Sequence, residues 1–377
     1  MDLWQRPLEK LVMKLAQVNP DFWKGKKVFL TGHTGFKGSW LSLWLSSMGA
    51  KVTGYSLMPN TTPNLYNVLG IDSRIEKSHI ADIRDTANLQ KAMTEARPDV
   101  VIHMAAQALV RESYINPLET YAVNVFGTAS ILDAIRQIPE VRGVVIVTTD
   151  KCYENKEWEW GYRENDPLGG YDPYSSSKAC AELVTAAYRQ SFFNPLDYSK
   201  HGVAIASARA GNVIGGGDWS ADRLIPDLLI GFEQGNSVRI RNPNAIRPWQ
   251  HVLEPLSGYL TLSEYLLSAD GVQYSGAWNF GPANSDARSV QWIADEMVRK
   301  IGGTASWVRD QDPQPHEANY LKLDCSKSYA RLGWKPRWDL SKTLSSIVDW
   351  QHSYSLSSDM HSLTLEQIAQ FLATKNE

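Results

Sequence analysis

Residues 27–38, KVFLTGHTGFKG, decide the fold of this chain. The first five form a short run of strand-forming residues, the glycines follow at once, and residues 39–48 then have a helical pattern. Glycines between a strand and a helix permit a tight turn and a close approach of the backbone to a pyrophosphate, which the helix N-terminus attracts. A glycine motif alone indicates only a turn, but in this position it predicts the first unit of a dinucleotide-binding domain.

The same alternation continues along the chain. Further apolar runs of about five residues lie at 51–55, 100–104, 143–148 and 203–208, and helical segments such as 118–138 and 176–193 lie between them. Continuous hydrophobic strands that alternate with helices indicate a parallel sheet covered on both faces. The predicted fold class is therefore α/β, a Rossmann-type doubly wound parallel sheet with a smaller mixed α/β C-terminal substrate domain.

Changes in this pattern set the predicted domain boundaries. The regular alternation ends near residue 210, and glycine- and proline-rich connections follow it. We assign residues 25–210 and 245–282 to the dinucleotide-binding domain, and residues 211–244 and 283–377 to the substrate domain. Apolar residues at helical spacing predict that residues 1–24 form an N-terminal helical extension.

The composition excludes several classes of protein. A net charge of −3 over 377 residues leaves no basic surplus for binding nucleic acid. Three cysteines cannot form a secreted disulfide framework, and the eight histidines lack a metal-ligand spacing, so we expect no metal site. We find no signal-peptide pattern and no apolar run of membrane-spanning length. We therefore expect a soluble cytoplasmic protein.

Tyr174 and Lys178 form the first candidate for a catalytic pair. In the sequence YSSSK they stand four residues apart, so in a helix they project from the same face. An ammonium beside a phenol stabilises the phenolate, and a tyrosine base working near pH 7 needs about 3 pKa units of such help. A solvent-exposed helix pair is the alternative interpretation.

The predicted second strand ends in Gly54, Tyr55 and Ser56, where dinucleotide-binding proteins often have an acidic residue that holds the adenosine ribose. The missing carboxylate leaves NADP open, but no arginine follows directly to bind a 2′-phosphate, so we favour NAD. We expect NAD to be held less tightly than in proteins that have this carboxylate, since each charge-assisted hydrogen bond contributes about 1.5–3 kcal/mol. Asp82, after the third strand, is placed to accept from the adenine amino group or is a solvated turn residue.

The order of these motifs resembles the extended short-chain dehydrogenase/reductase superfamily over roughly residues 25 to 350. Within it, the chain is similar to the nucleotide-sugar 4,6-dehydratases, and among those to the branch that acts on CDP-glucose. The segments that carry this resemblance are HTGFKGSW at 33–40, TTDKCYEN at 148–155 and RPWQHV at 247–252.

The resemblance implies a role for each catalytic residue. Thr149 would bind the sugar 4′-hydroxyl beside Tyr174, which would take its proton, while Lys178 would hold the ribose of NAD. Asp150 would protonate the departing 6-hydroxyl. Lys151 stands where the wider family has a glutamate that removes the C5 proton, so either it is a base in its neutral form, or it stays charged and stabilises the C5 enolate. An acid and a base adjacent at a strand end suit this elimination, while the alternative is a turn with a surface ion pair.

The resemblance also implies the binding residues. Those for NAD are Gly32, Thr34, Gly35, Phe36, Gly38, Asp82, Ile83, Ala105, Ala106, Asn124, Tyr174 and Lys178. Those for the nucleotide sugar are Gln107, Arg111, Asn212, Arg223, Arg247 and His251. Arginines suit a diphosphate because they form bidentate hydrogen bonds, although a structural salt bridge is the alternative for Arg223 and Arg247.

The implied reaction converts CDP-D-glucose to CDP-4-dehydro-6-deoxy-D-glucose, in deoxysugar and O-antigen (lipopolysaccharide) biosynthesis. The implied assembly is a homodimer that pairs helices of residues 121–138 and 176–193 in a four-helix interface. Alternatives are an epimerase with the same Tyr/Lys/NAD apparatus, a dehydratase for another nucleotide-hexose, and a catalytically silent dinucleotide-binding sensor. Asp150 and Lys151 separate a dehydratase from the epimerase, which needs no acid/base pair beside Thr149.

Overall fold

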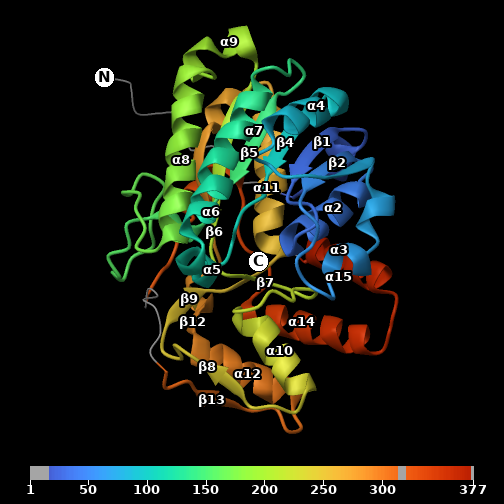
Figure 1. Cartoon of the computed structure of the whole chain (residues 1–377), viewed down its shortest axis with the longest axis vertical. Helices are drawn as coiled ribbons and strands as arrows, with labels where there is room; N and C mark the ends of the chain where they lie inside the picture. Colours follow the sequence, from blue (N-terminus) through green and yellow to red (C-terminus); the bar gives the residue numbers. More distant parts are fainter. Residues whose placement is uncertain (1–16, 313–319, 375–377) are drawn as a thin grey trace, which may run out of the picture.

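The computed structural model describes residues 17–312 and 320–374, and a seven-stranded parallel sheet forms its centre (Figure 1). The strands lie in the order β11-β6-β5-β4-β1-β2-β3. Their bounds are β1 (Lys27–Thr31), β2 (Lys51–Ser56), β3 (Lys77–Ile80), β4 (Val100–His103), β5 (Gly143–Val147), β6 (Ala204–Ala210) and β11 (Gly276–Phe280). The strand order reverses between β1 and β4, which makes the carboxyl ends of these strands the switch point of a doubly wound sheet. The predicted fold class is confirmed.

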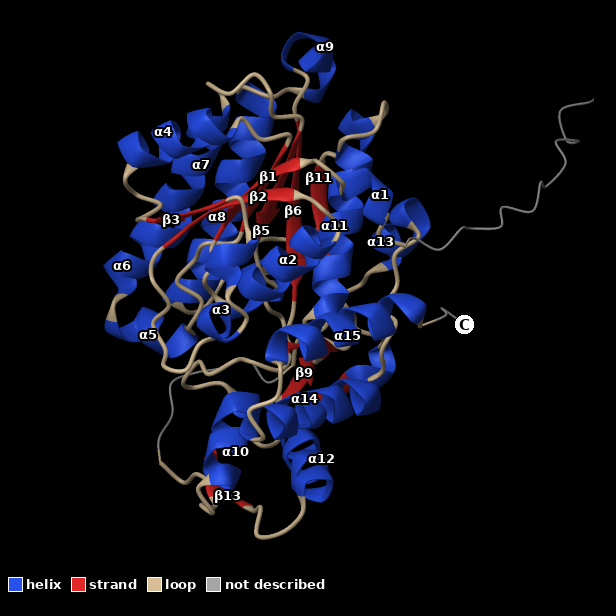
Figure 2. Ribbon diagram, turned by 90° about the vertical axis from the view of Figure 1, so that its right-hand side faces the viewer, coloured by secondary structure: helices blue, strands red, loops and turns tan. Residues whose placement is uncertain are grey.

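Helices cover both faces of the sheet (Figure 2). One face carries α2 (Phe36–Ser47) and α11 (Leu253–Leu266), and the other α4 (Thr86–Ala96), α7 (Gly127–Ile135) and α8 (Pro173–Ser191). Alternate residues of a strand point to opposite faces. Within β1, Val28 and Leu30 therefore join the core under α2, whereas Phe29 joins the core under α4 and α7. This two-sided burial explains why the strands are apolar throughout.

The helix predicted over residues 118–138 is interrupted. It begins with α6 (Pro117–Tyr121), passes through a π-helical turn (Ala122–Phe126) and continues as α7. Asn124 lies in this turn, where its buried side chain holds a neighbouring loop. The helix predicted from residue 176 begins three residues earlier, because Asp172 caps it by accepting from the Ser175 N–H at 2.9 Å.

A smaller mixed region follows residue 210, with its own hydrophobic core around Leu228, Ile293 and Leu344. Its helices are α10 (Leu224–Glu233), α12 (Val290–Ile301) and α14 (Leu340–Ser355). Three pairs of short strands complete it: β7 (Val213–Ile214) with β10 (Gln250–His251), β8 (Val238–Ile240) with β13 (Trp307–Arg309), and β9 (Ile246–Pro248) with β12 (Ala287–Ser289).

The remaining elements are short or peripheral. They are α1 (Pro20–Trp23), α3 (Leu65–Val68), α5 (Val110–Ile115), α9 (Tyr198–His201), α13 (Ser326–Leu332), α15 (Met360–Ala373), and the 3-10 turns Ile71–Arg74, Asp150–Cys152, Pro195–Asp197, Gly271–Tyr274 and Asn284–Asp286. Within the described ranges, no helix combines the length and hydropathy needed to cross a bilayer.

The predicted domain boundaries stay a prediction. Strand β9, assigned to the dinucleotide-binding domain, pairs with β12 of the substrate domain. Helix α15, assigned to the substrate domain, packs on α2, where the Trp44 and Phe371 ring centroids lie 5.9 Å apart. Most of the predicted N-terminal extension lies outside the described residues.

Candidate active site

A cavity of about 660 Å³ lies at the carboxyl ends of the strands, between the sheet and the smaller region. It brings together nearly all of the predicted site residues: Gly32, Thr34, Gly35, Phe36, Gly38, Asp82, Ile83, Ala105, Ala106, Gln107, Arg111, Thr149, Asp150, Lys151, Tyr174, Lys178, Asn212, Arg223 and Arg247. Two predicted residues, Asn124 and His251, do not line it.

The glycine loop forms one wall, and its geometry requires glycine at two positions. Gly32 has φ +76°, and a Cβ atom there would lie 2.8 Å from the backbone nitrogen of Ala105. A Cβ atom at Gly38 would lie 2.0 Å from the Gly32 carbonyl oxygen. Because Gly35 is the N-cap of α2, no side chain caps the first amides of that helix, and they remain available to bind an anion.

The cavity wall near the end of β2 is polar but carries no carboxylate from that strand. The Thr34 and Ser56 hydroxyl oxygens are 2.8 Å apart, and Thr34 also donates to the Leu57 carbonyl oxygen. Asp82 pairs with Arg84, whose Nη2 lies 2.6 Å from Oδ2, and hydrogen bonds from this guanidinium lower the pKa of Asp82. The expectation that NAD is held less tightly stays a prediction.

Asn124 positions the site instead of lining it, which corrects the predicted direct contact. Its side chain accepts from the Gln107 N–H at 2.9 Å and donates to the Gln107 carbonyl oxygen and to Ser177 Oγ of α8. Asn124 therefore ties the loop after β4 to the helix that carries Tyr174. The side-chain amide of Gln107 is also occupied, since its Nε2 donates to the Leu109 carbonyl oxygen in the same loop and to Thr120 Oγ1 of α6.

His251 is a core residue, so its predicted contact with substrate is wrong. Its ring is fully buried between Trp40 and Trp338, with ring centroids 5.8 Å and 4.8 Å away. Burial lowers the pKa of His251 to about 3, which leaves the imidazole neutral.

Strand β5 delivers three of the catalytic candidates directly. Thr149 begins a 3-10 turn in which its hydroxyl accepts from the Lys151 N–H at 3.3 Å and donates to Asp150 Oδ1 at 3.0 Å. The other carboxylate oxygen of Asp150, Oδ2, is buried and has no hydrogen-bond partner among the described residues. Burial raises the pKa of Asp150, which favours the protonated form that a general acid needs.

Tyr174 and Lys178 face the same cavity from the first two turns of α8. Burial raises the pKa of Tyr174 to about 12, although its hydrogen bond with Thr149 opposes this. Burial lowers the pKa of Lys178 to about 8, and its ammonium donates to the Val147 carbonyl oxygen at 3.4 Å. The pKa of the phenol therefore lies above its ordinary value and not below it as expected, because desolvation outweighs the lowering effects of Thr149 and Arg223.

The smaller region contributes arginines to the opposite wall. Arg223 Nη1 lies 3.0 Å from Asp218 Oδ2, and Arg111 Nη1, from α5 of the sheet domain, lies 2.8 Å from Asp222 Oδ1. Arg247 is almost fully buried and donates to the Ile246 carbonyl oxygen. The salt bridge given as the alternative for Arg223 is thus present, and Arg111 also forms an ion pair, yet both side chains line the cavity.

Lys37 is a cavity residue that the sequence reasoning did not assign. Its ammonium donates to the Tyr259 hydroxyl at 3.1 Å and lies 5.2 Å from the centre of that ring. Burial lowers its pKa to about 7, and the charges of Arg223 and Lys178 add to this effect. The sequence shows a lysine in the glycine loop, but the direction of its side chain depends on contacts with α11 that no local pattern reveals.

The sequence matches a known family over most of its length. Residues 29–347 match the family described as GDP-mannose 4,6 dehydratase. The chain is 54% identical over 356 residues to the CDP-glucose 4,6-dehydratase of Salmonella typhimurium, covering 94% of this chain and 99% of that protein. It is 26% identical over 286 residues to a dTDP-glucose 4,6-dehydratase of Streptomyces antibioticus, covering 71% of this chain and 74% of that protein.

Solved structures share the fold. A dTDP-glucose 4,6-dehydratase from Streptomyces venezuelae, with NAD bound, superposes with a TM-score of 0.74 at 22% identity, covering 88% of this chain and 98% of that one. A UDP-glucose 4-epimerase from Thermotoga maritima superposes with a TM-score of 0.73 at 18% identity, covering 87% of this chain and 99% of that one. Because the fold is common to dehydratases and epimerases, the choice between them depends on the residues of the site.

Asp150→Asn should stabilise the protein while removing the acid. A carboxyl group whose pKa is raised by folding stabilises the folded state fully below its unfolded pKa of about 4, and this contribution is lost as the pH rises through the folded pKa. At pH 8 the variant should therefore melt about 2 °C or more above the wild type, and the difference should shrink toward pH 4. Thermal melts at both pH values measure this, with the exposed Asp270→Asn as the control. An unchanged or lower Tm at pH 8 would contradict the claim that burial controls this carboxyl group.

Proposed function

The chain belongs to the GDP-mannose 4,6 dehydratase family, and we propose that within this family it is a CDP-glucose 4,6-dehydratase. The reaction is the conversion of CDP-D-glucose to CDP-4-dehydro-6-deoxy-D-glucose. The observation that carries the proposal is the buried carboxyl group of Asp150, with an unpartnered oxygen, between Thr149 and Lys151 in the cavity that also holds Tyr174. An elimination needs this acid, whereas an epimerisation does not.

The cavity fits NAD. The glycine loop has no room for a Cβ atom at Gly32 or Gly38, and the uncapped N-terminus of α2 faces the cavity as a pyrophosphate site. Ala105, Ala106 and Asp82 would line the rest of the dinucleotide site. When bound, NAD accepts a hydride from C4 of the sugar and later returns it to C6.

Tyr174 and Thr149 act on the 4′-hydroxyl. Both side chains line the cavity, and Thr149 is near enough to Tyr174 to lower the pKa of the phenol, which supports a shared contact with one sugar hydroxyl. A phenol with a pKa of about 12 is a poor base, so ligand binding has to favour the phenolate before the proton moves. Lys178 stands one turn further along the same helix face, where its ammonium is placed to stabilise the phenolate.

Asp150 and Lys151 act in the elimination. A 4-keto group acidifies the C5 hydrogen, so a group near C5 and an acid near the 6-hydroxyl suffice to remove water. Burial favours the neutral form of the Asp150 carboxyl group, which would donate its proton to the leaving hydroxyl. Lys151 would remove the C5 proton or, as a cation, stabilise the enolate.

Cationic side chains would hold the nucleotide diphosphate. Arg223 and Arg247 line the cavity with Asn212, and guanidinium groups match phosphate oxygens in pairs. The choice of cytosine rests on the 54% identity to the Salmonella enzyme, since no base-reading contact distinguishes it here. We place the activity in the cytoplasm, in the synthesis of deoxysugars for lipopolysaccharide O-antigen.

A panel of nucleotide sugars tests the proposal. The purified protein is incubated with NAD and with CDP-, dTDP-, UDP- or GDP-hexoses, and the products are identified by mass and NMR. We expect a 4-keto-6-deoxy sugar from CDP-glucose and much slower turnover of the others. A C4-epimer with unchanged mass would instead identify an epimerase.

Tyr174→Phe should lose activity by about 10²–10⁴-fold and keep NAD binding, because only the hydroxyl is removed from a buried ring. Steady-state kinetics and NAD titration measure both effects. Tyr188→Phe, on the same helix but outside the cavity lining, is the matched control. Turnover near the wild-type rate in Tyr174→Phe would remove this hydroxyl from the mechanism.

Lys151→Ala should separate the two halves of the reaction. If Lys151 serves only the elimination, C4 oxidation continues and a 4-keto-hexose forms together with reduced cofactor, but no water is lost. The readouts are a burst of absorbance from the reduced cofactor and the loss of C5 exchange in deuterated water. The exposed Lys156→Ala should keep full turnover. If Lys151→Ala binds both ligands but gives no burst, Lys151 belongs to the oxidation.

A homodimer should form through α6, α7 and α8. Helices α6 and α8 lie side by side (Figure 1), and exposed apolar side chains are Ile115 at the end of α5, Leu118 of α6, Phe126 of the π-helical turn and Leu183 of α8. Exposed apolar side chains in such number mark an interaction surface. Sedimentation at micromolar concentration should give a dimer, and Leu183→Glu should give a monomer. Leu356→Glu, exposed elsewhere, should leave the dimer intact, and a monomeric wild type would rule the interface out.

A further inference from the structure

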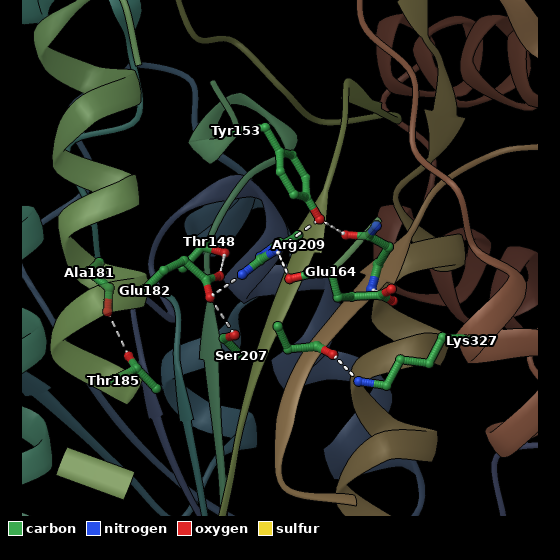
Figure 3. Close-up of polar contacts among 11 residues, drawn as sticks. Thr148, Tyr153, Glu164, Ala181, Glu182, Thr185, Ser207, Arg209 and Lys327 are labelled. Carbon is green, nitrogen blue, oxygen red and sulfur yellow. Dashed lines mark hydrogen bonds and ion pairs between the residues drawn. The ribbon is translucent and has the colours of Figure 1, made fainter. Parts of the chain in front are cut away.

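A fully buried ion pair joins β6 to α8 (Figure 3). Arg209 Nη2 of β6 lies 2.8 Å from Glu182 Oε2 of α8, and the two side chains are only 3% and 4% exposed. Neither residue lines the cavity. Burying both charges costs more desolvation free energy than forming the same pair at the surface. Replacing a buried pair with apolar residues is therefore often neutral or stabilising for the fold. Stability alone is therefore a weak explanation for this pair.

Glu182 holds the chain just before the catalytic segment. Its Oε1 accepts from the Thr148 hydroxyl at 2.5 Å, and its Oε2 accepts from Ser207 Oγ at 2.7 Å. Thr148 is the residue before Thr149. Burial alone would raise the pKa of Glu182, but Arg209 and these hydroxyl donors hold it below its ordinary value, so it stays charged.

Arg209 holds the chain just after the catalytic segment. Its Nη1 donates to the Tyr153 hydroxyl at 2.8 Å and to the Glu164 carbonyl oxygen at 3.1 Å, and its guanidinium lies 4.8 Å from the centre of the Tyr153 ring. The Tyr153 hydroxyl in turn donates to Asn279 Oδ1. Residues 149–151 are therefore bracketed by Thr148 and Tyr153, and both of these are attached to one ion pair.

The same ion pair connects this segment to α8. Glu182 stands one turn after Lys178 and two turns after Tyr174, so the carboxylate that holds Thr148 belongs to the helix that carries both other catalytic residues. Its charge also opposes the effect of burial on the pKa of Lys178. The other titratable groups that interact with Lys178 are Cys152 of the turn after β5, His103 of β4 and Lys37 of α2.

We propose that Glu182 and Arg209 are positioning residues, which hold residues 149–151 in register with Tyr174 and Lys178. This inference rests on the proposed function, because it assigns the pair to the geometry of that reaction. The positioning role also explains why the pair lies where it does. It connects the end of β5 to the start of α8, the two elements whose residues must be aligned for the reaction.

Two single-hydroxyl variants test the positioning. Thr148→Val and Ser207→Ala each remove one donor to the Glu182 carboxylate, but only Thr148 adjoins the catalytic segment. We expect Thr148→Val to lower kcat on CDP-glucose at least about tenfold with a smaller change in KM, since a misplaced catalytic group loses rate more than binding. Ser207→Ala should keep kcat within about twofold. Equal kcat values in the two variants would overturn the positioning role.

Two further variants separate positioning from stability. In Glu182→Gln the carboxylate that raises the pKa of Lys178 is lost, so the alkaline limb of the kcat–pH profile should move to lower pH. The double variant Glu182→Leu/Arg209→Met replaces the pair with apolar residues, which removes the cost of burying two charges but leaves the Thr148 and Ser207 hydroxyls without their acceptor, so its Tm should fall. At a temperature where this variant stays folded, its kcat should be reduced at least about tenfold. A folded double variant with the wild-type kcat and an unmoved alkaline limb in Glu182→Gln would make the pair merely structural. Wild-type protein is assayed in parallel: if it turns over no nucleotide-hexose, the proposed function fails, whereas wild-type turnover matched by all the variants defeats only the positioning role.

Discussion

The close approach of the β1–α2 loop to the end of β4 is the constraint on which the rest of the site depends. At Gly32 the two backbones are too near for any side chain, and at Gly38 the helix begins against the carbonyl oxygen of Gly32. This contact lies at the point where the strand order reverses, so it opens a crevice at the carboxyl ends of the strands and directs the N-terminus of α2 into it. This one arrangement produces the cavity and the pyrophosphate site, and it places Lys37 in the cavity wall.

Burial is the second physical cause, and it acts on the catalytic residues with different signs. It raises the pKa of Asp150, which favours a protonated acid, and it lowers the pKa of Lys178 to about 8. It also raises the pKa of Tyr174 to about 12, which opposes its role as a base until ligands bind. Burial in one cavity thus favours the protonated form of Asp150, the proposed acid of the elimination, and opposes the phenolate of Tyr174, the proposed base of the oxidation.

Local pattern was enough to predict the fold and to indicate most of the proposed site residues that line the cavity. The apolar strands, the glycine loop and the TTDK segment carry their information within a few residues, and the parallel sheet places their ends at one edge. Prediction failed where the direction of a side chain depends on distant contacts. His251 is turned into a tryptophan-lined core, Asn124 sits in a π-helical turn and holds a loop, and Lys37 reaches Tyr259 of α11. The partners of Glu182 and Arg209 likewise come from separate strands and helices.

If one cavity oxidises C4, removes water across C5 and C6, and returns the same hydrogen to the sugar, the path of that hydrogen can be followed with an isotope. The measurement is turnover of CDP-glucose that carries deuterium at C4, followed by NMR of the product. We expect a 4-keto-6-deoxy sugar with that deuterium at C6 and one solvent hydrogen at C5. Deuterium that remains at C4, or that is lost to solvent, would contradict this expectation.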